Sequence, residues 1–216
     1  MTLSRRNLMI GVGVVVLAGA AGYWWASRPS VGPGPDGVDG TALHAPGTIG
    51  DKIIGADNAP ITMIEYASVT CPACAAFHTE TYPTLKSKYI ETGKVRFIFR
   101  EFPTQPAQVA VAGFMLARCS GDNYFAFVET LFEQQRVWSA DPGNGLLRIA
   151  RQAGFTEDSF AACLKDDRLA QGIQEIAERG NRNFEVNSTP TFFINGQKFV
   201  GVLTVEQLEK ILESML

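Results

Sequence analysis

The sequence has little cysteine, little histidine and little net charge. Its 216 residues include 4 cysteines and 2 histidines, and the formal net charge is -3 with a pI near 5.5. A chain without an excess of Lys and Arg lacks the electrostatic field that holds phosphates, and no basic stripe is interleaved with aromatic residues. We therefore expect no nucleic-acid partner. Internal repeats are also absent, so one globular domain is the simplest expectation.

The scarcity of cysteine and histidine limits the possible metal and cofactor sites. Structural zinc takes four ligands, but Cys119 and Cys163 are solitary, and neither His44 nor His78 has a partner at ligand spacing. Covalent haem needs a histidine directly after a Cys-x-x-Cys pair, where this chain has Ala75. We expect no metal and no external cofactor.

The amino terminus, residues 1–26, has the basic-then-apolar order of an export signal. Two adjacent arginines at positions 5 and 6 precede an uncharged stretch over 8–26. About 19 helical residues reach roughly 28 Å, close to the thickness of the bilayer core. Small residues at 18–21 suit cleavage of a signal peptide, whereas the aromatic residues 23–25 suit a retained membrane anchor. Both alternatives place the body in the periplasm or another extracytoplasmic space, in the second case anchored to the inner membrane by residues 8–26.

Residues 27–51 are rich in glycine and proline and show no apolar periodicity, which predicts a linker. We expect the folded domain over 52–216. Its first part has a β-rich apolar run at 61–67, a helical pattern at 74–92 and an alternating strand at 94–100. A strand, helix and strand of this length predict a parallel sheet.

A helical block follows the second strand and extends over about 104–185. Strand character returns at 191–195, turns at Asn195-Gly196 and resumes at 197–200, before a last helix from residue 204. A two-residue Asn-Gly connection is typical of a hairpin, so the last two strands should be antiparallel at one side of the sheet. The order predicts an α/β fold interrupted by helices.

Cys71, Pro72, Ala73 and Cys74 form a Cys-x-x-Cys motif where a strand turns into a helix. At a helix N-terminus, unpaired N–H groups and the macrodipole favour a negative charge, so we expect Cys71 to be a thiolate. A thiolate of low pKa attacks disulfides and also leaves readily. Pro72 suits the first helical turn. Cys74, about one turn along, should be more buried and act as the resolving thiol.

Two ionisable residues flank this motif. Glu65 lies in the apolar strand six residues before Cys71, where an ionised carboxylate is costly, so we expect it to exchange a proton with Cys74. The alternative is an outward-facing glutamate on a half-exposed strand. His78, seven residues after Cys71, lies on roughly the same helix face. We expect it to be an ordinary helix residue.

These motifs resemble the DsbA family of thioredoxin-fold oxidoreductases, in the branch with threonine before the cis-proline. The resemblance covers about residues 50–216. It implies a thioredoxin fold with an inserted helical domain, with Cys71 as nucleophile and Cys74 as resolving thiol, and with Pro190 in cis beside the disulfide. The matching features, in order, are Glu65, CPAC followed by AAFH at 71–78, FREFP at 99–103, the helical block, and STPTFFING at 188–196.

The resemblance also implies a function. It indicates a thiol:disulfide oxidoreductase that introduces disulfides into reduced or unfolded exported proteins through a mixed disulfide on Cys71. The backbone of Thr189 would pair with the extended substrate chain. A quinone-linked membrane protein would recycle the active site.

One residue of the motif departs from the best-known member of the family, and other residues leave alternative functions open. That member has histidine where this chain has Ala73, which cannot donate a hydrogen bond, so we expect Cys71 to be a weaker oxidant. Thr189 is also typical of disulfide isomerases that resemble this fold, so an isomerase or reductase is the first alternative. A copper metallochaperone is the second, although Met63 is the only methionine close to the motif in sequence.

Cys119 and Cys163 lie in two separate predicted helices. Two unpaired thiols are less expected than a bond in an exported protein, so we predict a structural disulfide between them. It would close a loop of about 45 residues and stabilise the fold by about 4 kcal/mol. The alternative is two separate buried thiols acting as small apolar side chains.

Overall fold

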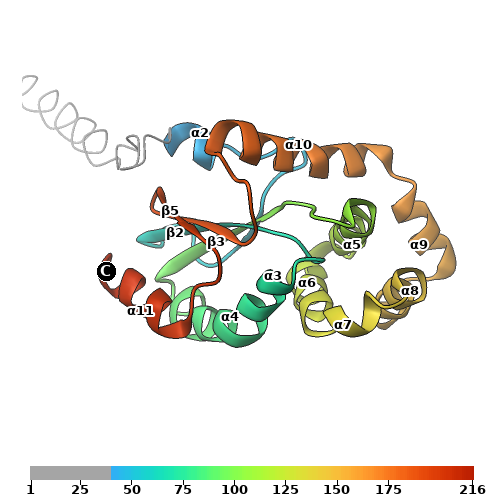
Figure 1. Cartoon of the computed structure of the whole chain (residues 1–216), viewed down its shortest axis with the longest axis horizontal. Coiled ribbons are helices and arrows are strands. Elements are labelled where there is room, and N and C mark those ends of the chain that lie inside the picture. Colours follow the sequence, from blue (N-terminus) through green and yellow to red (C-terminus); the bar gives the residue numbers. More distant parts are fainter. Residues whose placement is uncertain (1–39) are drawn as a thin grey trace, which may run out of the picture. The chain divides into compact units, whose positions relative to one another are not determined.

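The computed structural model describes residues 40–216. The predicted signal or anchor, and the linker as far as residue 39, lie outside the described residues. Within 40–216, no helix is long and apolar enough to cross a membrane. A five-stranded sheet in the order β1-β3-β2-β4-β5 is covered by helices on both faces, and further helices extend to one side (Figure 1). The strands are β1 (Lys52–Ile54), β2 (Ile61–Ala67), β3 (Val95–Glu101), β4 (Thr191–Ile194) and β5 (Gln197–Val200).

The sheet follows the predicted pairing. β2 and β3 are parallel, from Ile61 opposite Val95 onward, which confirms the strand-helix-strand prediction. β4 and β5 form the predicted antiparallel hairpin at the edge of the sheet. Its two turn residues, Asn195 and Gly196, have φ of 45° and 84°, the left-handed conformation that a two-residue hairpin turn requires. β1 is an additional strand, antiparallel to β3.

The helix after the Cys-x-x-Cys motif differs from the continuous helix expected over 74–92. Two π-helical turns interrupt it, and one of them ends just before Pro83. Proline has no backbone N–H and its ring clashes with the carbonyl one turn earlier, so a wider turn before it accommodates the ring. The four segments are α3 (Pro72–Ala76), η2 (Phe77–Thr81), α4 (Tyr82–Leu85) and η3 (Lys86–Ile90).

The helical block predicted between the second and third strands is present as a chain of helices between β3 and β4, of which α5 to α9 lie on the right of Figure 1 and α10 returns across the top to α2. A last helix, α11 (Val205–Glu213), follows β5. The helices of the insertion are α5 (Ala107–Cys119), η4 (Gly121–Asn123), α6 (Tyr124–Glu133), α7 (Gln135–Trp138), α8 (Pro142–Gln152), α9 (Glu157–Leu164) and α10 (Asp167–Phe184).

The folded part begins earlier than residue 52. A short helix, α2 (Gly40–His44), lies beside α10 (Figure 1), and Leu43 is fully buried. The buried guanidinium of Arg100 donates to the Leu43 carbonyl at 2.8 Å and to the Asp51 carboxylate at 2.8 Å. Arg118 donates to the Ile49 carbonyl at 2.9 Å. The predicted linker 27–51 therefore extended too far, because residues 40–51 supply the acceptors that two arginines of the body need.

The sheet separates two hydrophobic clusters. Met63 and Ala67 belong to the larger cluster, together with Cys74 and most of the insertion helices. Ile64 and Tyr66, which alternate with them along β2, belong to the smaller cluster under α2 and α10. Glu65 lies between Met63 and Ala67 on the same strand face, so its side chain points toward the helix that carries Cys74.

Candidate active site

Cys71 lies at the junction of β2 and α3. It is the N-cap residue of α3, with φ -84° and ψ 119°, and Pro72 occupies the first helical turn as predicted. Its N–H donates to the Ser68 carbonyl at 3.0 Å and its carbonyl accepts from Ala75 at 3.1 Å. Cys71 is a free, half-buried thiol. The residue is therefore partly exposed to solvent while its backbone is held at the start of the helix.

The environment of Cys71 lowers its pKa to about 5. The largest cause is a hydrogen bond with the Cys74 side chain, and burial acts in the opposite direction. The Thr189 side chain and the backbone N–H groups of Cys74 and Ala73 lower the pKa further. The residue at position 73 thus contributes through its backbone rather than through a side-chain donor. Near pH 7, Cys71 is a thiolate, the form that attacks disulfides.

Cys74 has the opposite character. It is a free thiol and fully buried. Burial raises its pKa well above the ordinary value, and the hydrogen bond with Cys71 and the negative charge of Glu65 raise it further. The two thiols are three residues apart, yet one is held as a thiolate and the other as a protonated thiol.

The loop before β4 lies against Cys71. The Thr189–Pro190 peptide bond is cis, as the family resemblance implied. The Cys71 sulfur lies 3.3 Å from the Thr189 carbonyl oxygen, to which a protonated thiol donates. Thr191, which follows Pro190, donates its hydroxyl to the Ser188 carbonyl at 2.8 Å, which fixes the loop. The structure therefore brings together residues 118 positions apart in sequence.

Glu65 is fully buried rather than facing solvent. Its Oε2 lies 2.9 Å from Nε2 of His78, and the exposed fractions of the two side chains are 0% and 3%. His78 is therefore not the ordinary helix residue that the sequence predicted, since it is paired with the only carboxylate on this face of β2. A helix histidine four residues after the resolving cysteine, with a glutamate in the preceding strand, is a signal that could have found this pair.

Gln135 is a site residue that the sequence analysis missed. It belongs to α7 in the insertion, is buried, and donates its Nε2–H groups to the Val69 carbonyl at 2.9 Å and the Cys71 carbonyl at 3.0 Å. These two hydrogen bonds tie the insertion to the loop that carries the nucleophile. No local sequence pattern marks a glutamine 64 residues away from its acceptor.

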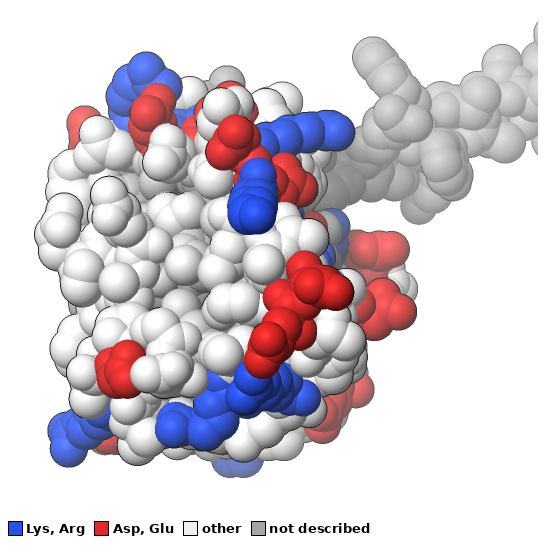
Figure 2. Space-filling view, turned by 90° about the vertical axis from the view of Figure 1, so that its right-hand side faces the viewer, with Lys and Arg blue, Asp and Glu red and all other residues white. Residues whose placement is uncertain are grey.

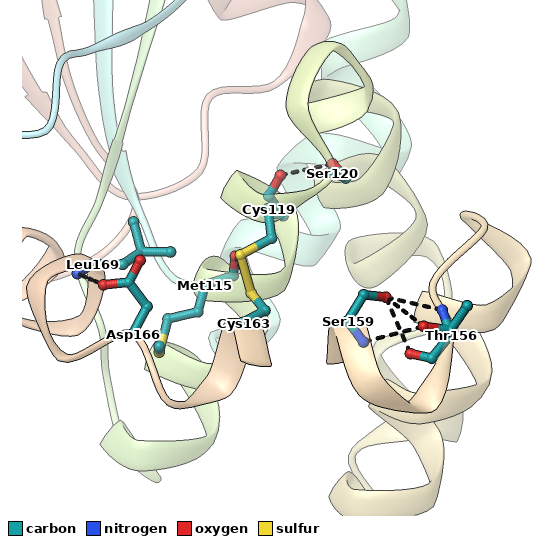
Figure 3. The surroundings of a disulfide bond; sticks show 9 residues. Met115, Cys119, Ser120, Thr156, Ser159, Cys163, Asp166 and Leu169 are labelled. Carbon is teal, nitrogen blue, oxygen red and sulfur yellow. Dashed lines mark hydrogen bonds between the residues drawn. A yellow bond between two sulfur atoms is a disulfide. The ribbon is translucent and has the colours of Figure 1, made fainter. Parts of the chain in front are cut away.

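The second cysteine pair lies away from this junction, within the insertion. Cys119 at the end of α5 and Cys163 near the end of α9 are joined by a disulfide (Figure 3). α9 begins with a reciprocal cap between Thr156 and Ser159, and Asp166 caps the following helix by accepting from the Leu169 N–H at 2.9 Å (Figure 3). The bond therefore links α5 to α9, and local hydrogen bonds fix the start of α9 and the start of the helix that follows it.

The outer side of the insertion carries few charges near its centre. Figure 2 views the molecule from the right of Figure 1, where Lys, Arg, Asp and Glu gather along the edges of the face. Between α5, α9 and α10 lies a hollow without charged lining residues. Its lining is formed by Ala107, Gln108, Val111, Ala112, Met115, Leu164 and Gln174.

Comparisons with known proteins agree with this geometry. The family described as thioredoxin matches residues 47–214. A Rickettsia bellii protein named as a protein-disulfide oxidoreductase is 34% identical over 155 residues, which cover 68% of this chain and 57% of that protein. The chain thus spans little more than half of that relative's length. Disulfide bond formation protein D of Bacillus subtilis is 24% identical, over 85% of this chain and 83% of that protein.

A solved structure extends the comparison to the fold. The crystal structure of α-DsbA1 from Wolbachia pipientis is 30% identical and superimposes with a TM-score of 0.71, covering 76% of this chain and 90% of that one. It shares the thioredoxin fold with a helical insertion that the sequence predicted. The chain therefore belongs to the thioredoxin family and, within it, to the DsbA family of thiol:disulfide oxidoreductases.

Proposed function

We propose that this protein exchanges disulfides with other proteins, with Cys71 as the nucleophile and Cys74 as the resolving thiol. The observation that carries the proposal is the contrast between the two thiols. Cys71 has a pKa of about 5 at the start of α3, whereas burial holds the neighbouring Cys74 in the protonated form. A thiolate of low pKa is a good leaving group, which favours the dithiol over the disulfide and makes the oxidised protein a disulfide donor.

The reaction has two steps. A substrate thiolate attacks the Cys71 sulfur of the oxidised protein, the bond to Cys74 breaks, and Cys74 leaves and takes a proton. The second thiolate of the substrate then attacks the substrate sulfur that is bonded to Cys71, the substrate disulfide forms, and Cys71 leaves as a thiolate. The substrate loses two electrons and gains a disulfide, while the protein gains the two electrons. Glu65, which is fully buried and acts electrostatically on Cys74, is the group proposed to exchange the proton.

The proposed substrates are reduced or unfolded exported proteins, which enter as extended chains beside Thr189 and Pro190. The Thr189 carbonyl already lies 3.3 Å from the reactive sulfur, so a strand paired with this loop would bring its own cysteine close to Cys71. The proposed location is periplasmic or extracytoplasmic, by way of residues 1–26. Reoxidation of Cys71 and Cys74 requires a membrane redox partner, which the relatives' role in disulfide formation supports.

The experiment that tests the proposal is the redox equilibrium of Cys71 and Cys74 against glutathione in the full-length protein. We expect a potential toward the oxidising end of the family range, nearer about -120 mV than about -270 mV. Cys71→Ser should abolish the equilibrium. A potential near the thioredoxin value would instead favour the isomerase or reductase, and recovery of activity from a scrambled disulfide substrate would identify that alternative directly.

A further inference from the structure

The turn at residues 68–71 joins β2 to α3 and ends at the reactive cysteine. Within this turn, the Cys71 N–H donates to the Ser68 carbonyl at 3.0 Å. α3 itself is five residues long and a π-helical turn follows it directly. So short a helical segment does not hold its own first residue firmly. The position of Cys71 therefore depends on contacts that reach the turn from other elements.

Gln135 holds this turn from the side of the insertion. Its side chain is buried, and Nε2 donates to the Val69 carbonyl at 2.9 Å and to the Cys71 carbonyl at 3.0 Å. Both acceptors are carbonyl oxygens, which cannot donate, so the nitrogen of the amide and not its oxygen must face them. Each of the two amide hydrogens then serves one carbonyl. Both donors of the side chain are thus used on the turn that carries the nucleophile.

α7, the helix that carries Gln135, is itself firmly held within the insertion. Trp138 is fully buried, and its indole N–H donates to the Leu131 carbonyl of α6 at 2.7 Å. α8 passes so close that a Cβ added to Gly145 would lie 2.5 Å from the Trp138 carbonyl oxygen. α6 in turn packs against α3 (Figure 1). The Gln135 amide therefore projects from a well-packed part of the insertion.

The loop after β3 contacts other groups of the same turn. The Ser68 hydroxyl accepts from the Thr104 N–H at 3.1 Å, and the Thr70 hydroxyl donates to the Thr104 carbonyl at 3.1 Å. These bonds hold the side chains at 68 and 70, whereas Gln135 holds the backbone at 69 and 71. Of the two sets of contacts, the one made by Gln135 includes the peptide group of the nucleophile.

We propose that Gln135 is a positioning residue for disulfide exchange, which holds the backbone of Cys71 so that its sulfur is aligned with the incoming substrate thiolate. The inference rests on the proposed function and gives the inserted helical domain a part in the reaction. An attacking thiolate must approach a disulfide sulfur along the line of the bond that breaks. A misplacement of about 1 Å is enough to slow such a reaction strongly.

Two fixed groups define this line at Cys71. The resolving thiol, Cys74, is fully buried on one side. The Thr189 carbonyl, beside which the substrate chain is proposed to bind, lies 3.3 Å from the Cys71 sulfur. If the turn moves, the angle between the Cys71–Cys74 bond and the incoming thiolate changes, although neither thiol is altered chemically. Gln135 therefore acts on the geometry of the reaction through the backbone of Cys71.

The ionisation of Cys71 is set by different groups, so it can be separated from this role. The hydrogen bond with Cys74 is the largest cause of its lowered pKa, and Thr189 and the first backbone N–H groups of α3 add to it. With a pKa of about 5, Cys71 is fully ionised at pH 8 and would remain so after an increase of one unit. A rate measured at pH 8 thus reports on alignment and not on the thiolate fraction.

The test compares two reactions of the full-length protein at pH 8. One is oxidation of a reduced two-cysteine peptide by the oxidised protein, which requires alignment with the Cys71–Cys74 bond. The other is alkylation of Cys71 in the reduced protein by iodoacetamide, a small reagent that can approach the thiolate from any open side. Gln135→Met keeps the length of the side chain and removes both donors. We expect peptide oxidation to slow about tenfold and alkylation to change less than about twofold.

A second variant and a control separate the donor from general packing. Gln135→Glu keeps the shape of the side chain, but its ionised carboxylate cannot donate, so peptide oxidation should slow at least as much as in Gln135→Met. Thr156→Ala removes the side-chain cap of α9 and weakens the insertion away from the turn. It should keep the wild-type rate. Wild-type rates in both Gln135 variants, equal losses in the two reactions, or a tenfold loss in Thr156→Ala would each overturn the inference.

A measurement on the wild type tests the contact without any substitution. Both Nε2 hydrogens of Gln135 should exchange with solvent at least about tenfold more slowly than those of the exposed Gln152 and Gln171, in NMR spectra of the reduced protein. Exchange as fast as in these two glutamines would refute the positioning role even if the variants did not fold. Failure of the proposed function looks different, because the wild type would then not oxidise the peptide.

Discussion

The two cysteine pairs of this chain lie at opposite kinds of helix end. Cys71 caps the N-terminus of α3, whereas Cys119 is the last residue of α5 and Cys163 is the next-to-last residue of α9. The amide groups at a helix N-terminus favour a negative charge, and the carbonyl groups at a C-terminus disfavour it. The same side chain is therefore favoured as a reactive thiolate in one place and disfavoured as one in the other.

The pairs also differ in what surrounds them. Cys71 and Cys74 are three residues apart and have unequal environments, with the pKa lowered for the first thiol and raised for the second. Cys119 and Cys163 are separated by 44 residues and connect two helices of the insertion. The separation of two cysteines in sequence and their position at a helix start or a helix end therefore distinguish a reactive pair from a structural disulfide.

The largest expected effect comes from removing the reactive cysteine of the Cys71–Cys74 pair. Cys71→Ser should lower the rate of oxidation of a reduced two-cysteine peptide by more than about 1,000-fold, because serine cannot form the mixed disulfide. The double variant Cys119→Ala with Cys163→Ala should retain most of the wild-type rate. Peptide fluorescence on disulfide formation measures both. Equal losses of oxidation rate in the two variants would show that the Cys119–Cys163 pair is needed for the reaction as much as Cys71 is.

The next largest effect is the loss of stability expected when the Cys119–Cys163 disulfide is removed. Removing the Cys119–Cys163 bond frees the unfolded chain from a loop of 44 residues, so the free energy of unfolding should fall by about 4 kcal/mol. Urea unfolding of the double alanine variant, beside wild-type protein with the bond intact, measures the difference. Non-reducing peptide mapping should also find the two cysteines linked. Alkylation of both cysteines without prior reduction would dispose of the disulfide.

The exchanging pair could be predicted from sequence because its determinants are local. Cys71 to Cys74 and the strand-to-helix change occupy one short segment, and the apolar surroundings of Glu65 are visible within β2. Residues 40–51 could not be assigned to the body in the same way. Their glycine and proline content is typical of a linker, and only the fold shows that Arg100 and Arg118 take their carbonyls as acceptors.

The contacts of Gln135 could not be predicted for a different reason, because its two acceptors lie 66 and 64 residues away in the chain and no periodic pattern relates them. The contact of His78 with Glu65 spans only 13 residues but joins a strand to the segment after the Cys-x-x-Cys motif, and the sequence analysis did not use that proximity. His78 also lies in a π-helical turn, where the 3.6-residue period no longer relates a residue to its helix face in the usual way. The seven-residue spacing between Cys71 and His78 therefore did not predict the two side chains that His78 contacts, Glu65 and Phe132.

A smaller effect is expected from removing Gln135, which hydrogen-bonds the loop that carries Cys71. Gln135→Leu leaves the carbonyls of Val69 and Cys71 without this donor, which should lower the free energy of unfolding by about 2 kcal/mol. The control is its exposed neighbour Arg136→Ala, expected to change stability by less than about 0.5 kcal/mol. Urea unfolding measures both. Equal stabilities would show that the insertion does not support the active-site loop through Gln135.

The smallest effect concerns the loop that lies against Cys71. The thiolate fraction should be half at about pH 5, constant above about pH 6 and tenfold lower for each unit below pH 5, because the pKa is lowered to about 5. Thr189→Val removes a hydroxyl that favours the thiolate and should move the midpoint upward by about half a unit to one unit. Iodoacetamide alkylation at pH 5 should then slow about two- to fivefold, with no change at pH 8. Cys74→Ala removes the largest cause of the lowered pKa and should move the midpoint further. A larger shift from Thr189→Val than from Cys74→Ala would mean that the loop, and not the partner thiol, sets the ionisation of Cys71.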